Sequence, residues 1–330
     1  MNRIKNFIKD NFKYILITLI VVLIFNIKLP YYILAPGGII KIDDRIETSS
    51  SHDTKGSINL LYVTQYDGNI SALIMSIFMK EWDVEKLSKE QISDETAKEI
   101  HTRSKIMLDN SVSNAIYVAY KKSGKTPKIK ERHNIVLATT KDNDIKINDE
   151  IISANDIEID NINTLKEILR NTNSNKIKLK VKRGDKLLDV EVPIVVEDNN
   201  KIIGIMVITN YVYDISDEVK INFKASEGGS SGGLMTAVSI YNAINDIDIT
   251  KGLNIGGTGT IDINGNVGEI DGIKYKIMGA VKNNLDIVFV PSANYKDALD
   301  TKNKYGYDIE IVSVNTFDEV IDYLNNCNEK

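Results

Sequence analysis

The stretch Ala225-Ser-Glu-Gly-Gly-Ser-Ser-Gly-Gly-Leu-Met-Thr-Ala237 joins a loop rich in glycine and serine to an apolar-periodic segment. Apolar residues continue at helical spacing through Ile244, so the pattern predicts a helix that begins where the loop ends. A serine at a helix start lies near the positive end of the helix dipole and near free backbone amides, which can bind an oxyanion. Such a loop also suits phosphate binding or a purely structural turn, and alone it leaves these alternatives open.

A second segment supplies a chemical partner for such a serine. Residues 254–270 predict two short strands around an Asn-Gly turn, and residues 272–281 predict a helix. Lys276 falls on the apolar face of this helix, where desolvation lowers the pKa of a lysine and lets it act as a neutral base. Lys274 falls elsewhere on the helix and is expected to be a solvated surface charge. A lysine base needs no histidine.

The composition argues against several classes of protein. The 330 residues include 41 basic and 46 acidic side chains, and the net charge of −5 argues against nucleic-acid binding. One cysteine, Cys327, and three separated histidines offer neither a disulfide nor a His/Cys metal site, so we expect no metal and no cofactor. The triplet Gly124-Lys-Thr is not a Walker A loop, because Ala119 stands where that loop needs a glycine and Pro127 follows. We therefore expect no ATP binding.

The two segments carry a family resemblance. Residues 200–327 resemble the proteolytic domain of Lon proteases. The run Gly229-Ser-Ser-Gly-Gly233 stands where that family has Gly-Pro-Ser-Ala-Gly, and Gly257-Thr-Gly-Thr-Ile261 matches its Thr-Gly-Glu-Ile strand. Gly272-Ile-Lys-Tyr-Lys276 matches Gly-Gly-Leu-Lys-Glu-Lys, in which the second lysine is catalytic, and residues 287–291 match the apolar strand that follows.

The resemblance implies roles for individual residues. Ser231 is then the nucleophile and Lys276 the general base. The residues that the resemblance assigns to supporting the oxyanion or the lysine are Gly229, Ser230, Gly232 and Thr258. Two departures are visible, since Ser230 replaces the family's proline and Gly232 its alanine. The first leaves open which serine attacks, with Ser231 favoured.

The N-terminus carries the pattern of a membrane segment. Four basic residues precede Tyr14, and residues 12–34 are mostly apolar, with Tyr31 and Tyr32 near their end. The length suits a transmembrane helix, and the positive-inside rule places the N-terminus in the cytoplasm. We therefore expect a single-pass anchor in the cell membrane with the catalytic domain outside the cell. A cleaved signal peptide, for which no A-x-A-like site is present, and a buried core helix are the alternatives.

Residues 131–198 resemble a PDZ domain. The family's order is present: a strand at 133–139, a segment at 148–156, a short helix at 163–170 and a charged strand pair. The segment follows the pattern Gly-Asp-x-Ile-x-x-x-Asn-Gly, but Asn148 and Asp156 replace its two glycines. Asn163 is a candidate N-cap of the helix. Because no Gly-Leu-Gly-Phe-type loop precedes the first strand, two interpretations stay open: a groove that captures peptides and a purely structural module.

The expected fold class is α/β (α+β), with an N-terminal transmembrane helix, a PDZ-like β module, and a Lon-type proteolytic domain of mixed sheet and helices. The expected divisions are a basic tail and anchor (1–35), a strand and helical region packing on the protease (36–130), the PDZ-like domain (131–198) and the protease domain (199–330). This order resembles the membrane-tethered, ATP-independent Lon-like proteases of Gram-positive bacteria.

The expected function is that of a serine endopeptidase with a Ser-Lys dyad, cleaving extended or unfolded protein segments outside the cell. Its partners are then protein or peptide substrates and the membrane, and a homo-oligomer in the form of a hexameric ring is the family's usual state. The alternative is a catalytically silent, membrane-anchored scaffold that binds peptides. The presence of both Ser231 and Lys276 argues against this alternative.

Overall fold

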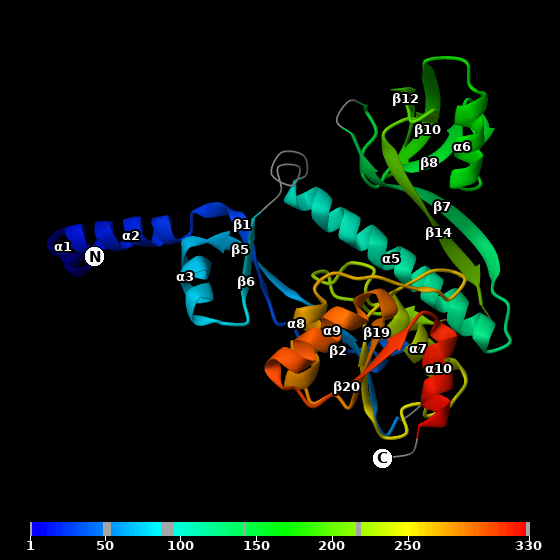
Figure 1. Cartoon of the computed structure of the whole chain (residues 1–330). Helices are drawn as coiled ribbons and strands as arrows, with labels where there is room; N and C mark the ends of the chain where they lie inside the picture. Colours follow the sequence, from blue (N-terminus) through cyan, green and yellow to red (C-terminus); the bar gives the residue numbers. More distant parts are fainter. Residues whose placement is uncertain (1, 49–53, 87–95, 141–142, 216–218, 328–330) are drawn as a thin grey trace.

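The architecture is mixed α/β, and the computed structural model describes residues 2–48, 54–86, 96–140, 143–215 and 219–327 (Figure 1). Within these ranges, three sheets contain three or more strands. One sheet lies at the centre of the C-terminal half, one forms a separate β module, and one lies near the N-terminus (Figure 1).

The central sheet has five strands in the order β2-β4-β16-β19-β20. All neighbours are parallel except β2, which runs antiparallel to β4. Parallel strands that are buried on both faces consist of consecutive apolar residues. This holds for β19, in which all five residues are buried. The strands are β2 (Ile39–Lys41), β4 (Ser57–Leu61), β16 (Asn254–Gly257), β19 (Ile287–Pro291) and β20 (Glu310–Val314).

Helices cover both faces of this sheet. Side chains of β19 alternate between two hydrophobic clusters, because successive residues of a strand point to opposite faces. Phe289 packs with α7, α10 and the C-terminal half of α5, whereas Val288 and Val290 pack with α8 and α9. The helices are α5 (Ala97–Lys122), α7 (Gly233–Ile244), α8 (Ile273–Lys282), α9 (Ser292–Tyr305) and α10 (Phe317–Asn326).

Helix α5 has a sharply defined start. Thr96 and Glu99 form a capping box, in which each side chain bonds the other's backbone amide. The apolar spacing in the sequence predicts a helix from about Ser88 to Lys122, but residues 87–95 lie outside the described ranges. The helix ends at Lys122, and Gly124 with φ of 73° turns the chain toward the β module.

The β module is built on strands in the order β11-β10-β8-β7-β14, with β9 paired to β8. Helix α6 (Ile162–Asn171) packs Leu165 and Leu169 against this sheet. The predicted N-cap Asn163 is wrong by two residues, because Asn161 accepts bonds from the amides of Asn163 and Thr164. The strands are β7 (Lys128–Thr139), β8 (Glu150–Ala154), β9 (Ile157–Glu158), β10 (Lys176–Arg183), β11 (Lys186–Pro193) and β14 (Ile205–Asp214).

The N-terminal segment corrects the expected transmembrane helix. Helix α1 (Asn2–Asp10) is followed by α2 (Phe12–Phe25), whose 14 residues make about 21 Å of helix. None of the helices in the described ranges has both the length and the apolarity that crossing a bilayer requires. The predicted single-pass anchor, and with it the predicted placement in the cell membrane, is therefore not supported.

The reason is that the apolar residues after α2 form a strand. The helix ends at Phe25, with Asn26 as its C-cap, and Lys28–Ala35 form β1 of a sheet with the order β5-β1-β6. Proline at position 30 is compatible with a strand near its start but not with a helix interior. The partner elements are β5 (Thr64–Asn69), β6 (Asp83–Lys86) and the helix α3 (Ile70–Phe78) between them.

Candidate active site

Ser231 lies in the loop that precedes α7, and its backbone is fixed from two sides. The Ser231 carbonyl accepts a hydrogen bond from the Gly259 amide at 2.8 Å and one from the Thr258 hydroxyl at 3.1 Å. The Gly233 amide donates to the Ser230 carbonyl at 3.2 Å, and α7 begins there. The predicted helix start is therefore present, with Ser231 two residues before it.

Lys276 lies in the first half of α8 and is almost fully buried, with 3% of its surface exposed. Its Nζ donates to Thr258 Oγ1 at 2.8 Å. Burial lowers the pKa of Lys276 to about 8, and the nearby Asp271 carboxylate opposes this shift. A lysine with this pKa is neutral in a substantial fraction of molecules near physiological pH, as a general base must be.

Thr258 connects the two residues. Its hydroxyl accepts from the Lys276 amine and donates to the Ser231 carbonyl, and Thr258 itself is fully buried. Ser231 and Lys276 both line one cavity of about 580 Å³, which we call the Lys276 cavity. The structure thus brings together Ser231, Lys276 and Thr258, three residues that the sequence resemblance singled out.

The amides around Ser231 differ in their availability. The Gly229 amide donates to the Ser104 carbonyl of α5 at 2.8 Å, so this predicted oxyanion donor is already engaged. The Ser230 carbonyl accepts from Ser111 Oγ, also on α5, at 3.1 Å. The amides of Ser230, Ser231 and Gly232 have no acceptor within the described residues. These three amides, rather than that of Gly229, are free to bind an oxyanion.

The charged residues around Lys276 occupy distinct positions. Glu269 and Asp271 line the Lys276 cavity, and neither forms an ion pair within the described part of the chain. Lys274, predicted to be a solvated surface charge, instead pairs with Asp83 of β6. The sequence could not indicate this contact, because Asp83 is separated from Lys274 by 191 positions. No group of three or more side chains suited to a metal ion occurs among the described residues.

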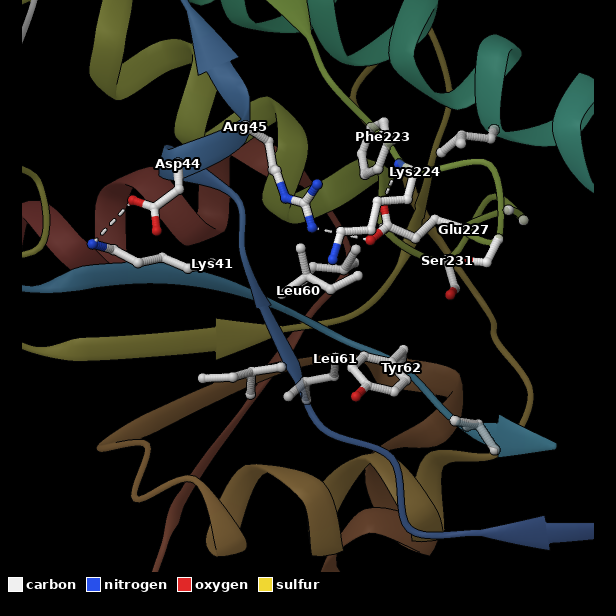
Figure 2. A pocket seen from close by; sticks show the side chains of 18 residues that line it. Lys41, Asp44, Arg45, Leu60, Leu61, Tyr62, Phe223, Lys224, Glu227 and Ser231 are labelled. Atoms are coloured by element: carbon white, nitrogen blue, oxygen red, sulfur yellow. Dashed lines mark hydrogen bonds and ion pairs between the residues drawn. The ribbon is translucent and has the colours of Figure 1, made fainter. Parts of the chain in front are cut away.

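A second cavity of about 580 Å³ also has Ser231 in its lining (Figure 2). We call it the Leu60 cavity. The two cavities share Ser231, Gly228 and Gly229, and also Tyr62 and Val63 from the chain just after β4. The remaining walls come mainly from residues 223–232 of the Ser231 loop and from β2, β4 and the short helix η1 (Asp43–Arg45). Sequence reasoning missed the walls from β2, β4 and η1, because these residues lie more than 160 positions before Ser231 and carry no motif.

The charges of the Leu60 cavity are mostly paired. Arg45 contacts Glu227 at 3.1 Å, and Lys41 contacts Asp44 at 3.2 Å (Figure 2). Arg45 Nη1 also donates to the Asn222 carbonyl at 3.1 Å. The Arg45–Glu227 pair thus ties η1 to the loop that carries Ser231. The apolar side chains that line the cavity are Ile39, Ile40, Leu60, Leu61, Leu108 and Phe223.

Leu60 also explains why glycine occupies position 232. A Cβ atom on Gly232 would lie 2.5 Å from Leu60 Cδ1, although the backbone angles of Gly232 (φ −93°, ψ −5°) suit any residue. We expect Gly232→Ala to lower the free energy of unfolding by about 1–3 kcal/mol through overpacking. In the double variant Gly232→Ala/Leu60→Val, the shorter side chain relieves the clash. Denaturant unfolding measures the coupling, expected to be about 1 kcal/mol. Strictly additive effects contradict this account.

Comparisons with known proteins agree with the geometry. Residues 217–326 match the family described as the Lon protease (S16) C-terminal proteolytic domain. The match includes the Ser231 loop and the helix that carries Lys276, and it supports a serine peptidase. The predicted Lon-type likeness is thereby confirmed for this part of the chain.

Individual relatives match over the same region. The chain is 34% identical over 96 residues to the Lon protease of Mesomycoplasma hyopneumoniae, a match covering 29% of this chain and 11% of that protein. It is 34% identical over 107 residues to the archaeal Lon protease of Methanocaldococcus jannaschii, covering 32% and 15%. The chain therefore spans only a small part of the length of these relatives.

A comparison with solved structures gives a weaker likeness. The PDZ domain of an SdrC-like protein from Listeria monocytogenes aligns with 24% of this chain and 93% of its own length, at 15% identity and a TM-score of 0.23. At this TM-score the likeness does not establish a PDZ fold for the module.

Proposed function

We propose that this chain is a serine endopeptidase in which Ser231 is the nucleophile and Lys276 the general base. The observation that carries the proposal is a buried lysine, with its pKa lowered to about 8, in the same cavity as a serine next to free backbone amides. Buried titratable groups with shifted pKa values in a cavity are typical of catalytic sites.

In the proposed reaction, neutral Lys276 takes the Ser231 hydroxyl proton as Oγ attacks the scissile carbonyl. The amides of Ser230, Ser231 and Gly232 bind the oxyanion of the tetrahedral intermediate. The protonated lysine then donates to the leaving amine, and water hydrolyses the acyl-enzyme. Lys276 donates to Thr258 in this structure, and hydrogen bonds of catalytic groups often tighten only in the substrate complex. We assign to Thr258 the role of holding the lysine beside Ser231.

We propose that the reaction needs no ATP and that the substrates are extended or unfolded protein segments. The Gly124-Lys-Thr triplet follows the end of α5 and is continued by β7, whereas a phosphate-binding loop must begin a helix. Two cavities that both have Ser231 in their lining suit a chain that passes across the nucleophile.

The rival function is a silent scaffold that binds peptides, and one observation favours a peptide site in the β module. Strand β14 lies at the edge of its sheet, and Gly204, with φ of 63°, immediately precedes it. An extended peptide can add to such an edge only along residues 205–208, because the Thr209 and Tyr211 carbonyls already accept hydrogen bonds from Asn110 and Ser113 of α5. Both functions can coexist, and only catalysis depends on Ser231.

The decisive assay incubates the full chain without nucleotide with an unfolded protein, beside its Ser231→Ala variant. New peptide products only with the unchanged chain support the peptidase. Binding of the unfolded protein by both forms, with cleavage by neither, favours the scaffold.

The rate of cleavage is expected to rise with pH as Lys276 loses its proton. With a pKa of about 8, the base is about one-tenth neutral at pH 7 and mostly neutral at pH 9, so kcat/KM rises about tenfold between them. Asp271 raises the pKa of Lys276, so Asp271→Asn should move the profile toward lower pH. A flat profile between pH 7 and 9, measured with one neutral peptide, contradicts Lys276 as the base.

A further inference from the structure

This inference rests on the proposed function. The position of Lys276 then determines in which direction a substrate chain runs across Ser231. A lysine that has taken the Ser231 proton must donate it to the leaving nitrogen, which belongs to the residue that follows the scissile bond. Lys276 lines only one of the two cavities that meet at Ser231. The residue after the scissile bond therefore lies in the Lys276 cavity, and the residues before it lie toward the Leu60 cavity.

The Lys276 cavity has an unbalanced charge. Glu269 and Asp271 are exposed on its wall, and neither has a cationic partner within the described part of the chain. Lys276 is the cation in the lining, and it must be neutral when it acts as base. The working cavity therefore presents two carboxylates without a counter-charge. Its other lining side chains are neutral and include Leu34, Tyr62, Val63, Gln65, Met107 and Thr260.

The Leu60 cavity does not share this negative charge, because its lining has three basic residues, Lys41, Arg45 and Lys224, and two acidic ones. Its acidic residues, Asp44 and Glu227, are each within 3.2 Å of a basic side chain. A cation gains little there, because both carboxylates are already neutralised. The two cavities thus differ in charge, and the difference coincides with the direction set by Lys276.

We propose that Glu269 and Asp271 are specificity-determining residues that select a lysine or arginine immediately after the scissile bond. A cationic side chain in the Lys276 cavity supplies the missing counter-charge, whereas an acidic one is repelled by both carboxylates. The selected substrates are peptides cleaved on the amino side of a basic residue. The side chain before the bond meets the Leu60 cavity, whose lining combines apolar side chains with charged ones.

The test compares peptides that differ only in the residue after the scissile bond: lysine, glutamine or glutamate. Cleavage sites are first mapped by mass spectrometry on an unfolded protein digested by the full chain, and the peptides are built around one such site. Exposed ion pairs are individually weak, so four attractive and repulsive interactions together should favour lysine over glutamate by about tenfold in kcat/KM. Raising the salt concentration should reduce this ratio.

The matched variants distinguish the effect of the two carboxylates on the cavity wall from the effect of the protein's net charge. Glu269→Gln should reduce the lysine-to-glutamate ratio to about threefold, and Glu269→Gln/Asp271→Asn should bring it close to one. Asp297→Asn removes the same charge from an exposed position on α9 outside both cavities and should leave the ratio unchanged. The ratio is compared within each variant, so a general change in Lys276 affects both peptides equally.

Each result has a definite consequence. Ser231-dependent cleavage with equal rates for the three peptides, or a preference that survives in the double variant, overturns the specificity proposal and leaves the peptidase standing. Absence of Ser231-dependent cleavage of the unfolded protein and of every peptide overturns both.

Discussion

Lys276→Arg should lower kcat/KM by about 10⁴-fold or more while the protein stays folded. The substitution keeps the positive charge, but a guanidinium cannot give up its proton at working pH and so cannot act as a base. The Lys276 site is also closely fitted, with 3% of the lysine surface exposed and its Nζ 2.8 Å from Thr258 Oγ1. Hydrolysis of a fluorogenic peptide measures activity, and circular dichroism checks the fold.

The companion variants test whether two residues act as a unit. Ser231→Ala should be as inactive as Lys276→Ala, and the double variant should be hardly worse than either. Lys282, exposed in the last turn of the same helix, is the matched control, and Lys282→Ala should keep full activity. Lys274→Ala should retain most activity although it loses the ion pair with Asp83. Full activity in folded Lys276→Arg is incompatible with the mechanism.

Local pattern was sufficient to predict the helix that follows Ser231 and the helix that carries Lys276. The apolar periodicity begins directly after the run of glycine and serine, and α7 begins at Gly233. The apolar stripe of α8 predicted a buried Lys276, because neighbours three and four positions away share one face. Both features are encoded within a few residues, and the structure differs from the expected boundaries by one residue at α8.

Features that depend on distant segments were not predictable. The apolar residues of 12–34 together suggested one long helix. The second half of this stretch instead forms β1, because it pairs with β5 and β6. Ile33 is fully buried in this arrangement. Part of the wall of the Leu60 cavity likewise comes from β2 and β4, which join the sheet because β4 pairs with β16 and β2 pairs with β4. The local sequence pattern of a strand does not indicate which other strand pairs with it.

Which backbone amides of the Ser231 loop are free of hydrogen bonds could not be predicted from the sequence either. The glycine-rich loop suggested that Gly229 faces an oxyanion, but the loop folds back so that its amide meets the Ser104 carbonyl. Gly229 has φ of 91°, a region that glycine enters without steric cost. Composition indicates that such a turn is possible, and only the position of α5 decides which amides remain free.

Replacing Lys276 with methionine should stabilise the protein by about 3 kcal/mol at pH 7. Folding moves the pKa of this lysine from 10.5 to about 8, because burial disfavours the ammonium, and each pKa unit corresponds to about 1.4 kcal/mol. Methionine has a similar length and carries no charge to desolvate. Thr258 keeps its hydrogen bond to the Ser231 carbonyl, so its hydroxyl stays satisfied. The variant is inactive yet more stable, as expected when a site holds a group that is costly to bury.

The pH dependence of this gain identifies its origin. Between about pH 8 and 10.5 the unfolded chain binds a proton at Lys276 that the folded chain does not, so the stability contributed by this lysine rises with pH. The advantage of Lys276→Met should therefore be complete below about pH 8, shrink through this window and nearly vanish by about pH 11. Urea unfolding of both proteins at pH 7, 9 and 10.5 measures the difference. Because other groups titrate equally in the two proteins, a constant difference across this range means that burial of the ammonium is not its cause.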